Sequence, residues 1–209
     1  MKVIDIYNFL DSIAPFNTAL PFDNAGLLVG EGQKEVKKIG VILDVTPEAV
    51  DFAAQNGIDL IISHHPVIFN PLKRLQTDSV PYLLAKYDIA VISAHTNLDA
   101  AKGGVNDALA KALELENIAP LAENDSGDFP PMGRTGTLKR PMSDRDFAIF
   151  VAEKLSTKAK TVLSGKEIAK VALCGGAGED FITPALKAGA DALVTADVKH
   201  HNLLLAGSL

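Results

Sequence analysis

Three histidines and an aspartate follow two apolar, strand-like runs of this chain. His64 and His65 come directly after the run 59–63, and His95 and Asp99 follow a second run of the same kind. In open α/β sheets, ligands bind at the carboxyl ends of parallel strands. Imidazole and carboxylate groups without sulfur suit Zn, Mn or Fe(II). The pattern therefore predicts a divalent metal site between neighbouring strands.

The adjacent pair His64-His65 has two interpretations. Successive side chains on an extended backbone point to opposite sides, so the pair fits two ions a few Å apart more easily than one. Pro66 keeps His65 extended and thereby fixes the direction of its side chain. The alternative is that both imidazoles only bond to backbone and water, and that Asp99 caps the segment after it.

Two other segments carry weaker chemical signals. Asn24 lies in a turn before an apolar run, where it is either a turn residue or a hydrogen-bonding group for a ligand near the metals. The glycine-rich segment 175–178 follows a strand-like run, where backbone N–H groups can hold a phosphate. It lacks the spacing of known nucleotide-binding loops, and a tight turn explains its glycines more simply.

Composition restricts the possible partners. The 209 residues are 47% hydrophobic and 22% charged, as in ordinary globular proteins. The net charge of −6 and the scattered basic residues argue against nucleic acid as the main partner. Cys174 is the only cysteine, which excludes an intramolecular disulfide. The N-terminus does not resemble a secretory signal, and no apolar run reaches the ~20 residues that span a bilayer. We therefore expect a cytoplasmic protein without a membrane partner.

The sequence contains an internal repeat. Residues 38–42 resemble residues 170–174, and residues 56–63 resemble residues 188–195; the two members of each pair are 132 positions apart. In both copies the predicted order is strand, helix, strand. We therefore predict an α/β fold of two similar halves, with mainly parallel sheets flanked by helices.

The repeat and the local signals define the expected domains. Residues 1–116 are predicted to form the first half, with the metal-ligand loops, and residues 133–209 the second half. Residues 117–132, rich in Pro, Asp and Gly, are predicted to be a linker or loop. Thr46 and Ser143 are predicted N-caps of helices, since a hydroxyl at this position accepts a hydrogen bond from an otherwise unpaired backbone N–H of the first turn.

These segments together resemble the NGG-one interacting factor three family, whose bacterial members are often labelled GTP cyclohydrolase 1 type 2 homologues. The resemblance covers nearly the whole chain and rests on residues 23–30, 63–66, 95–99, 133–136 and 197–201. It implies a ring-shaped homohexamer with a dinuclear metal centre in each subunit. By matching positions, it also implies that His64, His65 and Asp99 are metal ligands, with His95 close by.

The chain departs from the family pattern at two places. Phe22 precedes Asp23 where the family usually has Trp. The family also completes its metal site with a His and a Glu four residues apart, which the repeat places at about positions 227 and 231, beyond Leu209. Either the chain is truncated or its site has only the first half of these ligands. We also expect the last strand and helix of the second half to be missing, which would weaken metal affinity, packing and assembly.

Two functional hypotheses follow. The preferred one is a metal-dependent hydrolase of a small phosphorylated or nucleotide-like substrate, in which His64, His65 and Asp99 hold one or two divalent ions. His95 is then catalytic as a proton carrier, or is a further ligand. Opening of the GTP ring is the activity that the family label implies. The alternative is a non-catalytic metal-binding scaffold or regulatory protein that acts through protein–protein interactions.

Overall fold

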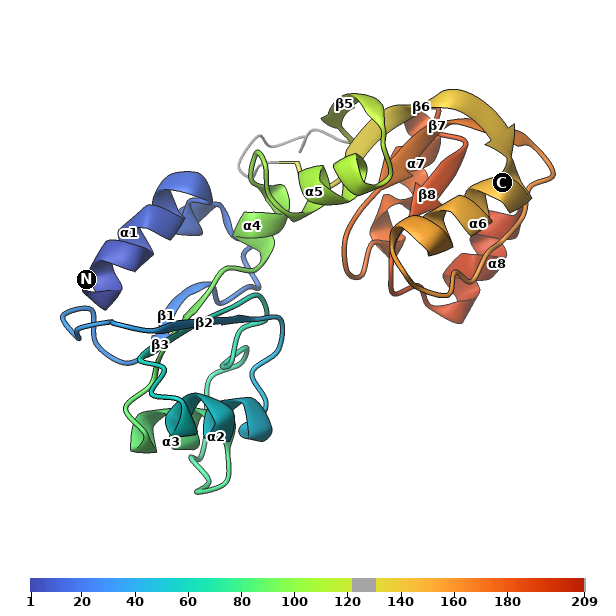
Figure 1. Ribbon diagram of the computed structural model, residues 1–209. Helices are drawn as coiled ribbons and strands as arrows, with labels where there is room; N and C mark the ends of the chain where they lie inside the picture. Colours follow the sequence, from blue (N-terminus) through green and yellow to red (C-terminus); the bar gives the residue numbers. More distant parts are fainter. Residues whose placement is uncertain (122–130, 209) are drawn as a thin grey trace. The chain divides into compact units, whose positions relative to one another are not determined.

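The computed structural model describes residues 1–121 and 131–208 (Figure 1). The chain divides into two compact units, Met1–Ala101 and Lys102–Leu209. Each unit contains one four-stranded sheet with helices packed against it. The predicted α/β architecture of two halves is therefore confirmed. Among the described residues, no helix is long and apolar enough to cross a membrane.

The first unit is built on a sheet with the strand order β1-β4-β3-β2. Its elements are α1 (Val3–Ile13), the short 3-10 helix η1 (Phe16–Thr18), β1 (Gly26–Val29), β2 (Ile39–Ile42), α2 (Pro47–Gln55), β3 (Leu60–Ser63), α3 (Val80–Lys86), β4 (Ala90–Ser93) and α4 (Thr96–Ala100). Strands β2, β3 and β4 are parallel, and β1 is antiparallel to β4. Helix α1 covers one face of this sheet, while α2 and α3 cover the other (Figure 1).

The two central strands of this sheet bury side chains on both faces. Leu60 and Ile92 pack toward α1, whereas Ile61 and Val91 pack toward α2 and α3. A strand covered on both faces needs a continuous apolar sequence rather than an alternating one. This requirement explains the apolar runs from which the strands were predicted.

The second unit has the strand order β5-β6-β7-β8. Its elements are α5 (Val105–Ala112), β5 (Glu116–Pro120), β6 (Arg134–Ser143), α6 (Asp144–Lys154), β7 (Glu167–Leu173), the 3-10 helix η2 (Glu179–Phe181), α7 (Ile182–Lys187), β8 (Ala192–Val194) and α8 (His200–Ser208). Among the described strands of this unit, only β7 and β8 are parallel. The expectation of mainly parallel sheets thus holds for the first unit and not for the second. Parallel neighbours need a crossover that returns the chain to the starting end of the strand, and here only the segment with α7 provides one.

The boundary between the units lies at Ala101 rather than at residue 116. Helix α5 belongs to the second unit because Ala110, together with the following Leu113, is buried in that unit's core. The predicted linker 117–132 also begins as a strand, since β5 pairs with β6. The rest of the predicted linker falls mostly on residues 122–130, which lie outside the described part of the chain.

The internal repeat is visible in the contacts as well as in the sequence. The Asp59 carboxylate accepts hydrogen bonds from the backbone N–H groups of Lys37 and Lys38, at 2.8 and 2.9 Å. The Asp191 carboxylate accepts the equivalent pair, 132 positions further along, at 3.0 and 2.8 Å. In both halves a carboxylate before one strand therefore binds the neighbouring segment, just before β2 in the first half and within β7 in the second.

Candidate metal centre

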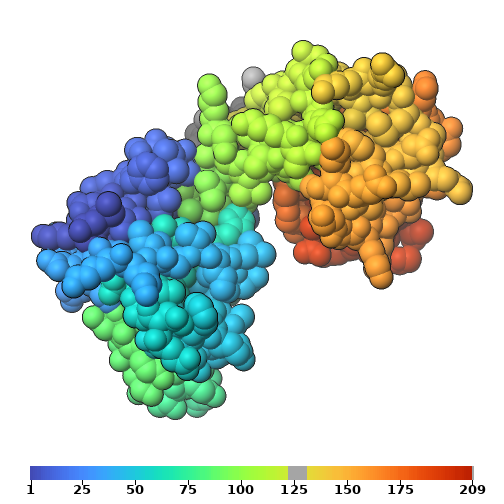
Figure 2. Space-filling model, viewed as in Figure 1, coloured from blue at the N-terminus to red at the C-terminus, as the bar shows by residue number. Residues whose placement is uncertain are grey.

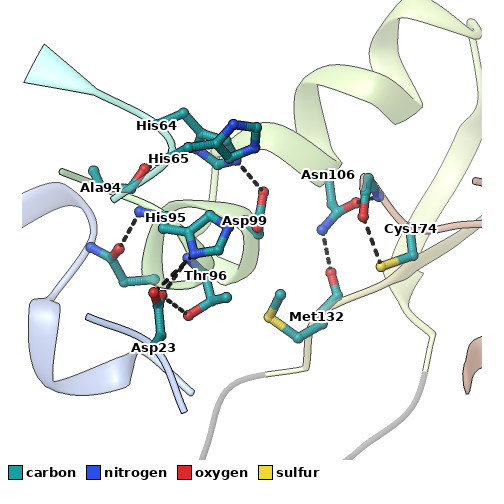
Figure 3. Close-up of polar contacts among 12 residues, drawn as sticks. Asp23, His64, His65, Ala94, His95, Thr96, Asp99, Asn106, Met132 and Cys174 are labelled. Carbon is teal, nitrogen blue, oxygen red and sulfur yellow. Dashed lines mark hydrogen bonds and ion pairs between the residues drawn. The ribbon is translucent and has the colours of Figure 1, made fainter. Parts of the chain in front are cut away.

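Three histidines meet at the carboxyl ends of β3 and β4 (Figure 3). His64 and His65 follow Ser63, the last residue of β3, and His95 lies between the end of β4 and the start of α4. One ring nitrogen from each histidine lies within 4.8 Å of the corresponding nitrogens of the other two. The structure thus brings together the three histidines that the sequence singled out.

Hydrogen bonds fix the tautomers of two of these rings. His64 Nδ1 lies 2.9 Å from the carbonyl oxygen of Ala94. A carbonyl only accepts, so Nδ1 carries the hydrogen and Nε2 keeps its lone pair. His95 Nδ1 lies 2.9 Å from Asp23 Oδ1, and a carboxylate has the same effect on that ring. In the neutral form of each ring, Nε2 is therefore the nitrogen whose lone pair can bind a metal.

Asp23 is a buried anion that holds His95 in place. Its side chain is fully buried and also accepts hydrogen bonds from the backbone N–H and hydroxyl of Thr96, at 3.0 and 2.5 Å. Burial alone would raise the pKa of Asp23, but the hydrogen bonds from Thr96 and His95 outweigh it and hold that pKa below its ordinary value. The carboxylate–imidazole pair resembles those that orient metal-ligating histidines.

His65 has a carboxylate partner of its own. Its Nδ1 lies 2.5 Å from Oδ1 of Asp44, which follows the end of β2. This pair is more open to solvent, with side chains that are 47% and 59% exposed. The contact again leaves Nε2 as the nitrogen that can face an ion, so each of the three histidines is anchored to the protein through Nδ1.

Asp99 supplies the carboxylate of the site. Asp99 lies on the first turn of α4, and its Oδ1 is 3.6 Å from His64 Nε2. Two ligands of one ion, each at roughly 2.0–2.2 Å, lie about 3–3.6 Å apart, so this separation suits a shared metal. Burial raises the pKa of Asp99, and the attraction of the nearby His64 opposes this rise. A divalent cation would favour the charged carboxylate in the same way.

The donor set as a whole fits a divalent transition metal. Three imidazoles and one carboxylate, without sulfur, are the ligands that Zn, Mn and Fe(II) share. Each imidazole is oriented by an acceptor behind it, as in known metal sites. Of the predicted ligands, His64 and His65 form this cluster together with His95, and Asp99 lies beside it, 3.6 Å from His64 Nε2.

The other candidate segments have structural partners. The Asn24 amide donates to the carbonyl of Ile68 at 2.5 Å and so ties down the loop after His65. In the glycine-rich segment, Gly175 N–H donates to Asn106 at 2.7 Å and Gly178 N–H donates to Thr195 at 2.9 Å. Because both N–H groups are used within the protein, the tight-turn interpretation is the better one.

Sequence reasoning missed the two acids behind the histidines. Asp23 was interpreted only as part of a turn, and Asp44 was not noticed. Asp44 could have been found, since it follows the strand next to β3 and strand ends of a parallel sheet share one edge. Asp23 gives no such signal, because it reaches His95 only through the antiparallel pairing of β1 with β4.

The sequence model of one protein family, Duf34/NIF3 (NGG1p interacting factor 3), matches residues 1–209 of the chain. The chain belongs to this family. The resemblance noted in the sequence is therefore confirmed. The chain is 34% identical over 207 residues to a Clostridium perfringens protein named GTP cyclohydrolase 1 type 2 homolog. That alignment covers 96% of this chain and 79% of the relative.

Solved structures of similar proteins share the fold over the whole chain. The crystal structure of Staphylococcus aureus protein SA1388 matches with a TM-score of 0.91 and 30% identity, covering 100% of this chain and 83% of that one. Reduced HcgD from Methanocaldococcus jannaschii matches with a TM-score of 0.80 and 32% identity, over the same shares of the two chains. In this DUF34/NIF3 protein, the histidine cluster thus lies on a fold that occurs in both bacteria and archaea.

Proposed function

We propose that this DUF34/NIF3 protein is a divalent-metal-dependent hydrolase of a small phosphorylated or nucleotide-like substrate. The observation that carries the proposal is the set of three histidines, each anchored through Nδ1, beside the buried carboxylate of Asp99. The name GTP cyclohydrolase 1 type 2 homolog, borne by the Clostridium perfringens relative, is consistent with a nucleotide-like substrate.

Each residue has a defined role in this proposal. His64, His65 and Asp99 hold one or two ions, which would be Zn, Mn or Fe. A bound ion of this kind lowers the pKa of a coordinated water and polarises the bond to be broken. His95 accepts a proton at Nε2 or serves as a fourth ligand, and the ionised Asp23 behind it stabilises the imidazolium that forms.

Aromatic side chains beside the cluster are suited to stack on a planar group of the substrate. The ring of Phe69 lies 6.5 Å from that of His95 and 6.4 Å from that of Phe22, centre to centre. Phe22 and Phe69 are 62% and 45% exposed, so their faces are open to a ligand. Aromatic faces of this kind stack on nucleobases regardless of sequence.

The test is a hydrolysis assay with added Mn, Zn or Fe(II) against nucleoside triphosphates and simple phosphate esters. We expect turnover that chelation abolishes and metal restores. Replacing both His64→Ala and His65→Ala should abolish turnover, whereas the exposed pair His200→Ala and His201→Ala, in the second unit, should leave it unchanged. Turnover insensitive to chelation would refute the proposal. Tight metal binding without turnover on any substrate would favour the non-catalytic scaffold.

A further inference from the structure

We propose that the second unit binds an acidic segment of a partner protein in a groove beside α6. This inference is independent of the proposed hydrolase function. The groove has a volume of about 270 Å³ and lies between α6 and residues 159–163. The orange segment around residue 160 lies at the surface of the second unit (Figure 2). All residues that line the groove belong to this unit.

One side of α6 forms the first wall of the groove. The helix residues that line it are Arg145, Ala148, Ile149 and Ala152. Their spacing of three and four residues places them on one side of the helix. The opposite side carries Phe147, which is buried in the core of the unit. Because alanine is small, this wall is hollow at a point where larger side chains would fill it.

The second wall is an extended segment with an unpaired backbone. Ala159, Thr161 and Leu163 line the groove, while the residues between them do not. This alternation is the period of an extended chain. None of residues 158–164 belongs to a helix or strand, and their backbone groups make no hydrogen bond to the described part of the chain. Unpaired backbone groups of this kind can receive an added strand.

The surroundings of the groove are basic. Residues 139–166 contain seven Lys and Arg but three Asp and Glu, in a chain whose net charge is −6. Arg145, Lys158 and Lys160 are exposed. None of these three forms an ion pair with another described residue. Their charges are therefore available to the carboxylates of a partner.

The alternation also defines the sequence pattern of the partner segment. Lys158 and Lys160 stand between the groove-lining residues, so they point to the other side of the extended segment. A strand paired with this segment places its alternate side chains on the same two sides. Its apolar side chains would fill the groove, and its acidic side chains would face the two lysines. The segment that fits is one in which acidic and apolar residues alternate.

Two other occupants fit the groove less well. Pockets for whole small ligands have volumes of roughly 300–1,000 Å³, so a hollow of about 270 Å³ suits single side chains of a larger partner. Apolar residues that bind a membrane surface enter the bilayer. Here Ala148, Ala152 and Ala159 instead line a hollow, which receives side chains rather than inserting into lipid.

The first test measures the fluorescence anisotropy of a short labelled peptide in which Glu and Leu alternate. We expect the natural chain to bind it. Lys158→Glu with Lys160→Glu should weaken binding at least about tenfold, because like charges then face each other. Ala159→Trp should block binding by filling the hollow. Lys73→Glu with Arg74→Glu, two exposed cations of the first unit, is the matched control and should have no effect.

Three results of this test would overturn the proposal. The first is a natural chain that does not bind the peptide. The second is equal binding of a control peptide with Ser in place of Leu, which would show a site for negative charge alone. The third is stronger binding to phosphatidylglycerol vesicles than to the peptide, which would identify a membrane surface as the occupant.

The second test is amide hydrogen exchange with and without the same peptide. The N–H groups of residues 158–164 should exchange rapidly in the free protein and at least about tenfold more slowly when the peptide pairs with them. Unchanged exchange in this segment would refute the pairing. Slow exchange before any peptide is added would show that another copy or segment already covers the groove, and would also overturn the proposal.

Discussion

The two halves of this protein share a strand–helix–strand unit, but their strand ends carry different chemistry. At the end of β3 stand His64 and His65, whereas the equivalent positions after β8 hold Ala196 and Asp197. Asp59 and Asp191 make the same paired backbone contacts in both halves. In the described part of the chain, the scaffold is thus repeated while the candidate ligands lie in the first copy. Function on this fold depends on loops at the strand ends, not on the repeated elements.

The strands also differ in burial. Leu60 in β3 is 0% exposed and lies between β2 and β4, whereas β8 is partly exposed along its length. Tight packing around β3 gives the histidines that follow it a rigid base. A ligand set needs such a base, since a site displaced by 1 Å loses much of its effect. The predictions below examine this contrast between the halves.

The largest expected effect concerns packing. Leu60→Ala should destabilise the first half by about 3 kcal/mol, because it leaves a cavity at a fully buried position. Leu193→Ala, in the half-buried β8, should cost the second half about 1 kcal/mol. Hydrogen exchange, which reports each half separately, measures both losses. Equal losses in the two halves would show that β3 is no more tightly packed than β8.

The next effect concerns the two pairs of consecutive histidines, His64-His65 in the first half and His200-His201 in the second. His64→Ala should weaken Mn or Zn binding at least about 100-fold, since changes even in residues that only orient ligands cost about 10–100-fold. His200→Ala removes a histidine from the exposed pair in the second half and should leave affinity unchanged. Isothermal titration of the metal-free protein measures both. A similar loss with either variant would mean that the first half does not hold the site.

A smaller effect is expected from the acid behind His95. Asp23→Asn keeps the shape of the side chain but replaces the anion that orients the ring, so metal affinity should fall about tenfold. Asp51→Asn, on the exposed surface of α2, serves as the control. The same titration measures both, and an unchanged affinity for Asp23→Asn would show that His95 needs no such support.

The smallest expected effect concerns Asp59, the carboxylate whose backbone contacts recur at Asp191 in the second half. Hydrogen bonds from the N–H groups of Lys37 and Lys38 hold the pKa of Asp59 below its ordinary value. A carboxyl whose pKa is lower in the folded state than in the unfolded state stabilises the fold at any pH above its unfolded-state pKa, near 4. This stabilisation is lost as the pH falls through the folded-state pKa. Asp59→Asn should therefore remove about 0.5 kcal/mol of stability at neutral pH and reduce the loss of stability on acidification. The effect is small because solvent screens this half-buried group. Urea unfolding at pH 7 and pH 3 measures this, and an identical pH dependence in the variant would count against it.

Local signals in the sequence were sufficient for several helices. Thr46 and Ser143 were predicted as caps, and their hydroxyls accept the N–H groups of Ala49 and Asp146 at 3.2 and 3.1 Å. Such contacts span three residues, so the information lies within one turn. The domain boundary was predicted at residue 116 and lies at Ala101, because the apolar face of α5 does not indicate which of the two sheets it packs against.

The sequence by itself determined that three histidines and Asp99 follow adjacent buried strands, since apolar runs and strand-end positions are local properties. Only the tertiary structure decided which groups stand behind those rings, because Asp23 and Asp44 approach them from β1 and β2 through pairings between distant segments. It also decided that β2 ends its sheet among the described strands, while its repeat counterpart β7 lies between β6 and β8. Strand order depends on long-range packing, which identical local patterns cannot specify.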